Sequence, residues 1–475
     1  MSTPAPAAPE LHQSYAEAVP ELSVPWRAEL PPQPEIAWLN EELAAELGLD
    51  PQWLRGQEGL ALLTGQIEGT TAQAYAGHQF GSANPQLGDG RAVLLGDLVD
   101  PAGRRRDLHL KGAGRTPFAR GGDGKAPLGP MLREAVIGEW LHAVGVPTTR
   151  ALAVLTTGER IAPRQGVTPE PGALLVRVAA SHLRVGTFEY AAWHLDPEVG
   201  RRLLDHTLDR HHPSADGPLG LLEAVMDAQA ELVAQWMLLG FVHGVMNTDN
   251  MALSGEGIDF GPCALLDVHR RDAVFSSIDR GGRYAYGRQP GIALWNLSRF
   301  AESLLPLMGT ADPNLAVEQA TGVLERFEGR YREAFERGLA DKLGLPRGAE
   351  IGDLGEELFA LLEAQEVDHT GFFRALGEGR AAELATDRAP MEAWIQRHRT
   401  LQGAGPSAEV ARVNPLYIPR NVPLDAALRA AHLGDLAPVH ELIGAVSSPF
   451  ERRAGLEHLE GPGDGGEHFL TFCGT

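Results

Sequence analysis

The sequence is short of cysteine and of basic residues. It contains 2 cysteines in 475 residues, Cys263 and Cys473, too few for a disulfide framework or a thiolate metal site. Its 41 Lys and Arg residues against 63 Asp and Glu residues give a net charge of -22. This charge disfavours nucleic acid or an anionic membrane surface as a partner. Any anionic ligand therefore needs a local positive site.

Long apolar runs and a targeting segment are also missing. No apolar run reaches the roughly 20 residues that a spanning helix needs, and the Ala- and Pro-rich N-terminus lacks a charged region followed by an apolar one. We therefore expect a soluble, non-secreted, cytoplasmic protein that acts as a monomer. With 43% hydrophobic residues, the chain is able to bury a large core in two or three globular units.

Hydrophobic patterning divides the chain into four parts. Residues 1–75 are Pro-rich and are expected to form an arm packed on the core. Residues 76–190 contain short strand-like runs interrupted by one helix at 130–145, which is typical of a β-rich small lobe. Residues 191–380 form a helical large lobe, and residues 381–475 a C-terminal extension. The order predicts an α+β, protein-kinase-like two-lobed fold with N- and C-terminal extensions.

The expected elements have definite positions along the chain. Strands are predicted at 91–95, 107–111, 151–155 and 173–177. Helices of the large lobe are predicted at 197–211, 221–241, 291–308, 314–343 and 353–365.

The most specific segment is the run His-Gly-Val-Met-Asn-Thr-Asp-Asn at 243–250, which is followed by Asp-Phe-Gly at 259–261. Protein kinases carry His-Arg-Asp before a distal Asn, and then Asp-Phe-Gly. This chain keeps the His, the Asn and the Asp-Phe-Gly, but Val245 stands where the catalytic Asp is expected. Because an apolar side chain accepts no proton, the segment predicts the metal-binding half of a kinase site without its usual base.

Three polar residues of this loop are candidates for chemistry. Asn250 and Asp259 offer hard oxygen ligands, which suit Mg²⁺ or Mn²⁺ when phosphate oxygens and water complete the shell. Asp249 is the other carboxylate of the loop and is the candidate proton acceptor for an attacking hydroxyl. The competing interpretation is structural: Asn250 would cap a turn, Asp249 would make an Asx-turn contact, and Asp259 would begin a structural loop.

A second group surrounds Lys111, which shares one face of a predicted strand with His109 and is expected to project away from the core. In kinases such a lysine contacts the nucleotide phosphates and pairs with a glutamate of the neighbouring helix, here Glu134 or Glu139. The segment from Lys111 to Arg133 is basic and interleaved with glycines, which predicts a local anion site. The alternative is a strand lysine exposed to solvent.

Two further groups are suited to phosphate. Gly88 and Gly90 precede Arg91 in a glycine-rich loop before a strand, although the loop does not match the Gly-x-Gly-x-x-Gly pattern. Arg177 and Arg184 flank a turn, and planar guanidinium groups bind phosphate well. Each group is weak evidence alone, because glycine loops and surface arginines are common.

Taken together, these segments resemble the selenoprotein-O family, protein adenylyltransferases with a pseudokinase fold. The similarity extends over most of residues 70–425. It rests on Tyr-Ala-Gly-His-Gln-Phe-Gly at 75–81, on 86–91, 110–118, 186–189 and 243–262, and on Asn414-Pro415 with Arg420-Asn421.

The resemblance implies transfer of AMP from ATP to Ser, Thr or Tyr hydroxyls of proteins, with Mg²⁺ or Mn²⁺ bound. ATP would be flipped relative to kinases, so that no base is needed at Val245. It implies Asp249 as proton acceptor, Asn250 and Asp259 as metal ligands, and an ion pair between Lys111 and Glu134. The residues it assigns to the nucleotide are Gly88, Gly90, Arg91, Lys111, Asp123, Gly124, Arg177, Arg184 and Asp259.

Two alternatives stay open at this stage. One is a kinase-like phosphotransferase that recruits Asp249 as a substitute base, and the other is a non-catalytic ATP-binding pseudokinase scaffold. The use of UTP, and redox control through Cys473 with Cys263 as its partner, are also left open by the sequence.

Overall fold

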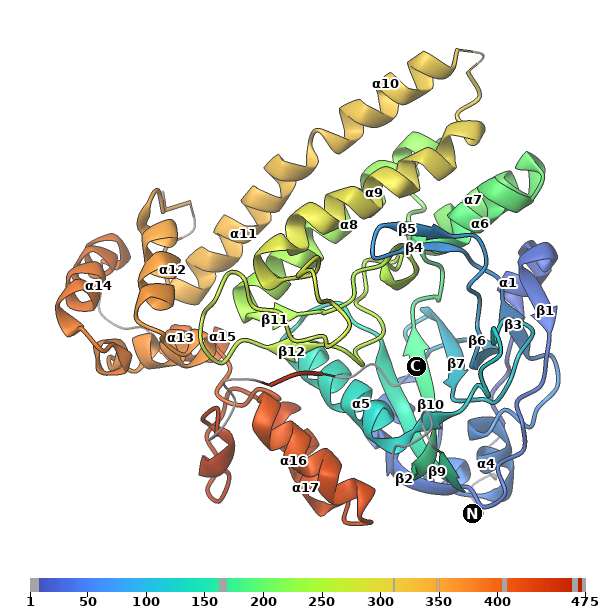
Figure 1. The fold of residues 1–475 in the computed structure, drawn as a ribbon, viewed down its shortest axis with the longest axis horizontal. Helices are drawn as coiled ribbons and strands as arrows, with labels where there is room; N and C mark the ends of the chain where they lie inside the picture. The colour runs from blue at the N-terminus through green and yellow to red at the C-terminus, as the bar shows by residue number, and fades with distance from the viewer. Residues whose placement is uncertain are drawn as a thin grey trace.

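The computed structural model describes residues 8–161, 169–310, 312–346, 348–349, 351–403, 408–463 and 469–471. Its architecture is α+β: one large antiparallel sheet lies at one end of the molecule, and most helices lie toward the other end (Figure 1). The likeness to a protein kinase stays a prediction.

The main sheet has the strand order β1-β3-β6-β7-β10-β9-β2, and β8 pairs with β10. All four predicted strands are confirmed as parts of β6, β7, β9 and β10, and the first of them was predicted to begin one residue too early, at Arg91. Strands β1, β2 and β3, which precede residue 75, belong to this sheet, so part of the proposed arm is part of the sheet. The division into four parts stays a prediction. The strands are β1 (Ser23–Pro25), β2 (Glu35–Leu39), β3 (Thr71–Gln73), β6 (Ala92–Val99), β7 (Arg105–Lys111), β8 (Ala126–Pro127), β9 (Arg150–Ile161) and β10 (Glu170–Ala179).

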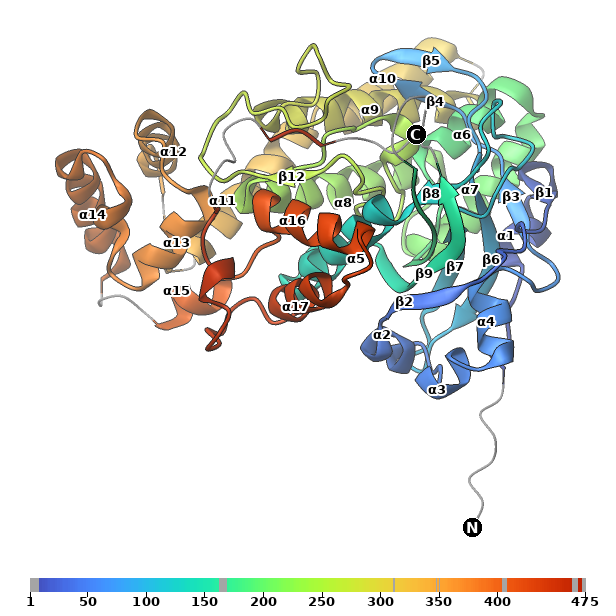
Figure 2. The same cartoon turned by 60° about the horizontal axis from the view of Figure 1, so that its bottom comes forward.

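Helix α5 (Leu128–Ala143) is the predicted helix of the small lobe. It is buried on nearly all sides, because β9 and β10 cover one side while α16 (Asn421–His432) and α17 (Ala437–Val446) cover another (Figure 2). Its charged residues therefore need partners inside the protein. Glu139 meets this need by accepting hydrogen bonds from Arg150 at 3.1 and 2.7 Å.

The helical half follows the predicted order, with one correction. The predicted helix at 314–343 is wrong as a single element, because its hydrogen-bond ladder tightens where Arg326 N donates to Val323 O. Both resulting helices pack on α8. These helices are α6 (Val185–His194), α7 (Pro197–His211), α8 (Gly217–Leu239), α9 (Gln289–Leu304), α10 (Pro313–Leu324), α11 (Phe327–Leu343) and α12 (Leu354–Ala364). The remaining helices are α1 (Ser14–Ala18), α2 (Glu41–Glu46), α3 (Pro51–Leu54), α4 (Gln57–Leu63), α13 (His369–Gly377), α14 (Arg388–Gln402) and α15 (Ala408–Val413).

The loop at 243–261 is held at both ends. Helix α8 ends at Gly240, whose φ of 68° is the left-handed conformation that glycine adopts most easily. The chain then enters β11 (Phe241–Val242), which pairs with β12 (Ala264–Leu265) after the loop. A second hairpin, formed by β4 (Gly77–Gln79) and β5 (Ser82–Asn84), contacts α6 and the loop. The loop is therefore fixed by paired strands.

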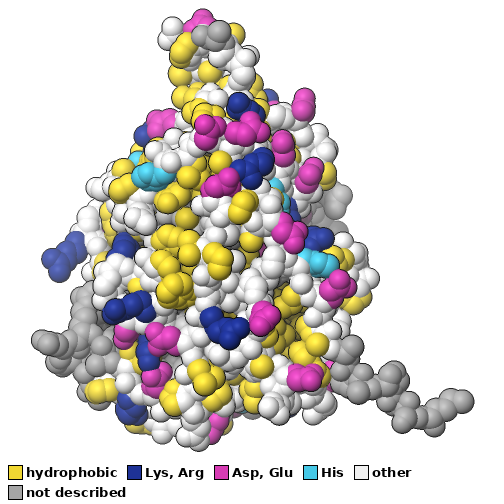
Figure 3. All heavy atoms as spheres, turned by 90° about the vertical axis from the view of Figure 1, so that its right-hand side faces the viewer, with side chains coloured by type: hydrophobic (Ala, Val, Ile, Leu, Met, Phe, Trp, Pro, Cys, Tyr) yellow, Lys and Arg dark blue, Asp and Glu magenta, His cyan; other side chains and the backbone are white. Residues whose placement is uncertain are grey.

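The surface matches the composition of the chain. On the face in Figure 3, acidic and basic side chains are interspersed with apolar ones. Across the described ranges, none of the helices is both long and apolar enough to cross a bilayer.

Candidate active site

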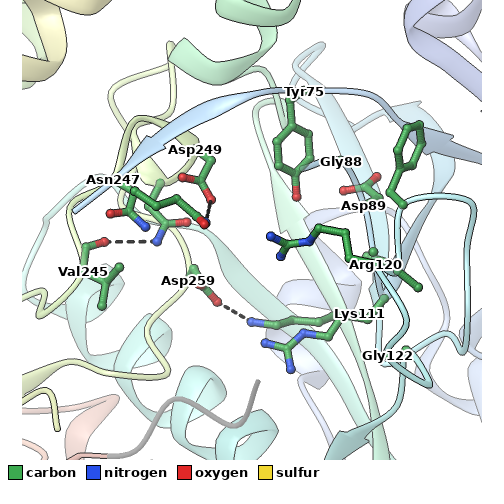
Figure 4. Close-up of a pocket in the computed structure, with 18 of the residues that line it drawn as sticks. Tyr75, Gly88, Asp89, Lys111, Arg120, Gly122, Val245, Asn247, Asp249 and Asp259 are labelled. Carbon is green, nitrogen blue, oxygen red and sulfur yellow. Dashed lines mark hydrogen bonds and ion pairs between the residues drawn. The ribbon is translucent and has the colours of Figure 1, made fainter. Parts of the chain in front are cut away.

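A cavity of about 780 Å³ lies between the main sheet and the 243–261 loop, within the size range of ligand sites. In Figure 4, Val245, Asn247, Asp249 and Asp259 lie on one side, and Gly88, Lys111 and Gly122 lie on the other. The structure brings together every residue that the sequence assigned to nucleotide, metal or catalysis. These wall residues are Gly88, Gly90, Arg91, Lys111, Asp123, Gly124, Arg177, Arg184, Asp249, Asn250 and Asp259.

Lys111 is at the centre of a buried ion cluster. Its Nζ donates to Glu134 Oε2 at 2.8 Å and also pairs with Asp259 Oδ1. Glu134 Oε1 accepts a further bond from Arg177 Nε at 2.6 Å. Burial opposes ionisation of Glu134, but Arg177 and Lys111 hold its pKa below the usual value. Of the two helix glutamates, Glu134 is thus the one that reaches the cluster.

As expected, Lys111 projects away from the apolar core, because Leu108 and Leu110 on the opposite face of β7 pack in a hydrophobic cluster while Lys111 lines the cavity. Its near-complete burial was not predicted. The residue is only 6% exposed, and its strand neighbour His109 is also buried. The physical reason is that β7 is a central strand between β6 and β10, so the face carrying both side chains looks into the molecule. The lysine is therefore a desolvated charge at the cavity wall.

Backbone strain gathers around this cavity. Four non-glycine residues of the described ranges have positive φ, and three of them, Phe80, Arg120 and Asp259, line the cavity. Such conformations cost about 1–3 kcal/mol each and are concentrated at functional sites. At Asp259 burial works against the charge, but Lys111, Arg177 and Arg91 overcome it and hold the pKa of the carboxyl far below its usual value.

Asp249 has a different environment. Its Oδ2 accepts a bond from Gln79 Nε2 at 3.2 Å, while its buried Oδ1 has no hydrogen-bond partner within the described chain. Burial raises the pKa of this carboxyl to about 6, although Arg184 opposes the shift. A carboxylate with a free oxygen and a pKa near neutrality is suited to accept a proton.

The loop also fits a hard divalent cation. Asn250 Nδ2 donates to Val245 O at 3.1 Å, which fixes the amide so that its oxygen is the end left for a ligand. Asp259 adds a carboxylate as a second hard donor. The described ranges contain no group of three or more His, Cys, Asp or Glu side chains that could hold a metal ion. An ion here would therefore take further oxygens from phosphate and water, as Mg²⁺ does.

Several residues of the site had no predicted role. The β4–β5 hairpin lies over the loop, where His78 N donates to Thr248 Oγ1 at 2.6 Å and Gln79 reaches Asp249. Tyr75 stacks under Arg184, with the guanidinium 4.4 Å from the ring centroid. The signal for these residues was the motif at 75–81, which carried the resemblance but suggested no contact.

Glycines allow the two phosphate-side loops to pack together. A Cβ added at Gly88 would lie 2.3 Å from the Phe118 ring, and one at Gly124 would lie 2.0 Å from Gly114 O. At such distances the backbone itself must move, so these glycines are required for close approach and not only for flexibility.

We expect Gly124→Ala to weaken ATP binding at least about tenfold and to lower the melting temperature, because the new methyl group would displace the loop. Gly121→Ala is a matched control. Both glycines have positive φ, yet a Cβ at Gly121 meets nothing within 4 Å. Calorimetric titration with a non-hydrolysable ATP analogue measures the difference, and equal effects of the two substitutions would refute the steric argument.

The cysteines give one observation. Cys263 is a buried thiol without a disulfide partner in the described part of the chain, and burial raises its pKa to about 12, so it resists ionisation. Cys473 lies outside the described residues, and so does any pairing between the two.

Comparison with known proteins bears on the whole chain. The family model described as "Protein adenylyltransferase SelO" matches residues 9–446. A protein of Mycolicibacterium smegmatis called "Protein nucleotidyltransferase YdiU" is 51% identical over 100% of both chains. Proteins of the same name from Pseudarthrobacter chlorophenolicus and Cereibacter sphaeroides are 50% and 51% identical, covering 97% of this chain and 97% and 98% of their own. With its loops, lysine and carboxylates assembled around one cavity, this chain belongs to the SelO family of protein adenylyltransferases.

Proposed function

We propose that the protein transfers AMP from ATP to Ser, Thr or Tyr hydroxyls of protein substrates, with Mg²⁺ or Mn²⁺ bound. The observation that carries this proposal is Asp249, a buried carboxylate with an orphaned oxygen in a cavity whose opposite wall is basic. The membership of the family supports the same chemistry. Since Val245 stands in the usual place of the kinase base, Asp249 is the proton acceptor that the loop offers.

Each wall of the cavity has a part in this reaction. Lys111, Arg177 and Arg184 place positive charge where the phosphates would lie, and glycine-rich loops allow their backbone to approach closely. Asp249 takes the proton of the acceptor hydroxyl as the hydroxyl oxygen forms a bond to the α-phosphorus of ATP. The bond between that phosphorus and pyrophosphate breaks, and pyrophosphate leaves. Asn250 and Asp259 would hold the cation, which supplies charge stabilisation to the phosphates.

ATP labelled separately at the α and γ positions tests this function. With a protein acceptor and Mg²⁺ or Mn²⁺ present, we expect label on protein only from the α position. Label only from the γ position would instead establish a phosphotransferase. An absence of transfer from either position, together with measurable ATP binding, would establish a scaffold.

Three finer features belong to the same proposal. We infer a protein-kinase-like two-lobed arrangement, supported by the order of a β-rich part, a long helix and a helical part. We further infer a cytoplasmic monomer, and a nucleotide turned end for end relative to kinases. A structure with a non-hydrolysable ATP analogue tests the last point, because AMP transfer requires the α-phosphorus near Asp249.

A further inference from the structure

Phe80 presents an aromatic ring at the mouth of the cavity. It stands at the turn of the β4–β5 hairpin with a φ of 53°, which is rare for a bulky residue. Its N–H donates to Asn247 Oδ1 at 3.1 Å and to Tyr284 OH at 3.0 Å, so the loop below enforces the strained turn. The residue is 39% exposed although its ring rests on that of Tyr284, with the centroids 5.2 Å apart. The strained backbone of Phe80 is thus held in place by hydrogen bonds, and it keeps an apolar side chain exposed.

Ile278 is a second apolar side chain at this mouth. It is 45% exposed and, with Phe80, it is one of two exposed large hydrophobic residues of the described ranges that line the cavity. The turn that follows it is rigid, since Asp279 accepts bonds from the N–H groups of Arg283 and Tyr284 at 2.9 and 2.7 Å. Arg283 in turn lies 3.3 Å from the position that a Cβ on Gly81 would occupy. The two apolar residues therefore stand on segments that brace each other.

The segment that carries Ile278 is rich in arginine. Residues 270–288 contain five arginines and two aspartates in a chain of net charge -22. Arg270 is neutralised by Glu366 at 3.0 Å. Arg280 and Arg288 are exposed, and the described residues give neither of them an ion pair. Arg280, two residues after Ile278, thus adds an exposed positive charge next to one of the two apolar side chains.

We propose that Phe80, Ile278 and Arg280 form the docking surface for the acceptor protein. This proposal rests on the proposed function. It predicts that the acceptor protein binds through a segment in which an apolar residue stands next to the hydroxyl residue and acidic residues lie nearby. The surface is continuous with Asp249, because Gln79, the neighbour of Phe80, donates to that carboxylate. Aromatic residues and arginines are the types enriched in protein interfaces.

Synthetic peptides provide the test. Each peptide carries one acceptor residue, which is Ser, Thr or Tyr. The residue next to the acceptor is either Leu or Ser, and the flanking residues are either Glu or Lys. Transfer from α-labelled ATP is measured as kcat/KM with the full chain. We expect the Leu and Glu combination to exceed the others by about tenfold, the effect of burying one large apolar side chain. Ile278→Ser should abolish the preference for Leu. Phe80→Asn, a residue that tolerates positive φ, should do the same. Arg280→Glu should shift the preference toward Lys flanks.

Val317→Ser is the matched control, because Val317 is an exposed apolar residue, 49% accessible, on the distant helix α10. This control, like Arg280→Glu, should bind the ATP analogue as the parent does. The Phe80 and Ile278 variants are compared at saturating ATP, because both residues line the cavity. A parent enzyme that transfers AMP without any preference among the peptides, or an Ile278→Ser variant that keeps the full preference, would overturn the docking proposal. A parent that transfers no α-label to any peptide or protein would instead overturn the proposed function.

Discussion

Asp249→Asn should lower the rate of AMP transfer by about 10²- to 10⁴-fold, the usual contribution of a positioned base. The amide keeps the shape of the carboxylate and the bond to Gln79, but it cannot take up the proton of the acceptor hydroxyl. Binding of the ATP analogue should persist, because Lys111 and the glycine loops are untouched. The measurement is single-turnover transfer of α-label with saturating ATP. A variant with the parent rate would remove Asp249 from its role.

The same residue sets a pH dependence. Since burial raises the pKa of Asp249 to about 6, its proton-accepting form is lost below that pH. The parent rate should therefore fall about tenfold per pH unit below pH 6, and the small residual rate of the Asn variant should lack this inflection.

The stability of the variant provides an internal control. A carboxyl whose pKa is raised in the folded state stabilises the fold below its unfolded pKa, and this contribution is lost as the pH rises through the folded pKa. At neutral pH the ionised Asp249 therefore weakens the fold. Asp249→Asn should raise the free energy of unfolding at pH 7 by up to about 3 kcal/mol. A loss of activity with a higher melting temperature excludes unfolding as its cause.

Asp259→Asn should lower AMP transfer at least about 100-fold, more than the loss typical of a residue that only orients a metal ligand. The substitution removes a carboxylate ligand and leaves Lys111 and Arg177 with Glu134 as their shared acidic partner. Asn tolerates the φ of 66° at this position, so the backbone is expected to stay in place.

Titration with Mn²⁺, followed by electron paramagnetic resonance in the presence of the ATP analogue, separates metal binding from catalysis. We expect weaker Mn²⁺ binding by Asp259→Asn and parental binding by Asp272→Asn, which alters an exposed aspartate outside the cavity. If Asp259→Asn binds Mn²⁺ as tightly as the parent, the carboxylate is not a ligand.

Local signals explain what could be predicted from the sequence. Short apolar runs bounded by glycine and polar residues located β6, β7, β9 and β10, because strands of this length end where turn residues begin. The spacing of His243, Asn250 and Asp259 located the loop, since turn geometry and ligand position are set within a few residues. These features depend on neighbours along the chain.

Contacts between distant segments could not be predicted in this way. Gln79 and Asp249 are separated by 170 residues, and the same separation joins His78 to Thr248. The burial of Lys111 depends on the central place of its strand, which follows from the sheet order and not from its own alternation. The motif at 75–81 was visible in the sequence, but its contacts with Thr248 and Asp249 cannot be identified from the spacing of residues along the chain.

The burial of Val245 limits which side chains this position tolerates. Val245 is only 5% exposed and lies in the same loop as Asp249, a buried carboxylate already short of a partner. An aspartate introduced at Val245 would bury a second uncompensated charge, which costs several kcal/mol. A single substitution therefore cannot place a base at this position without a loss of stability of that size.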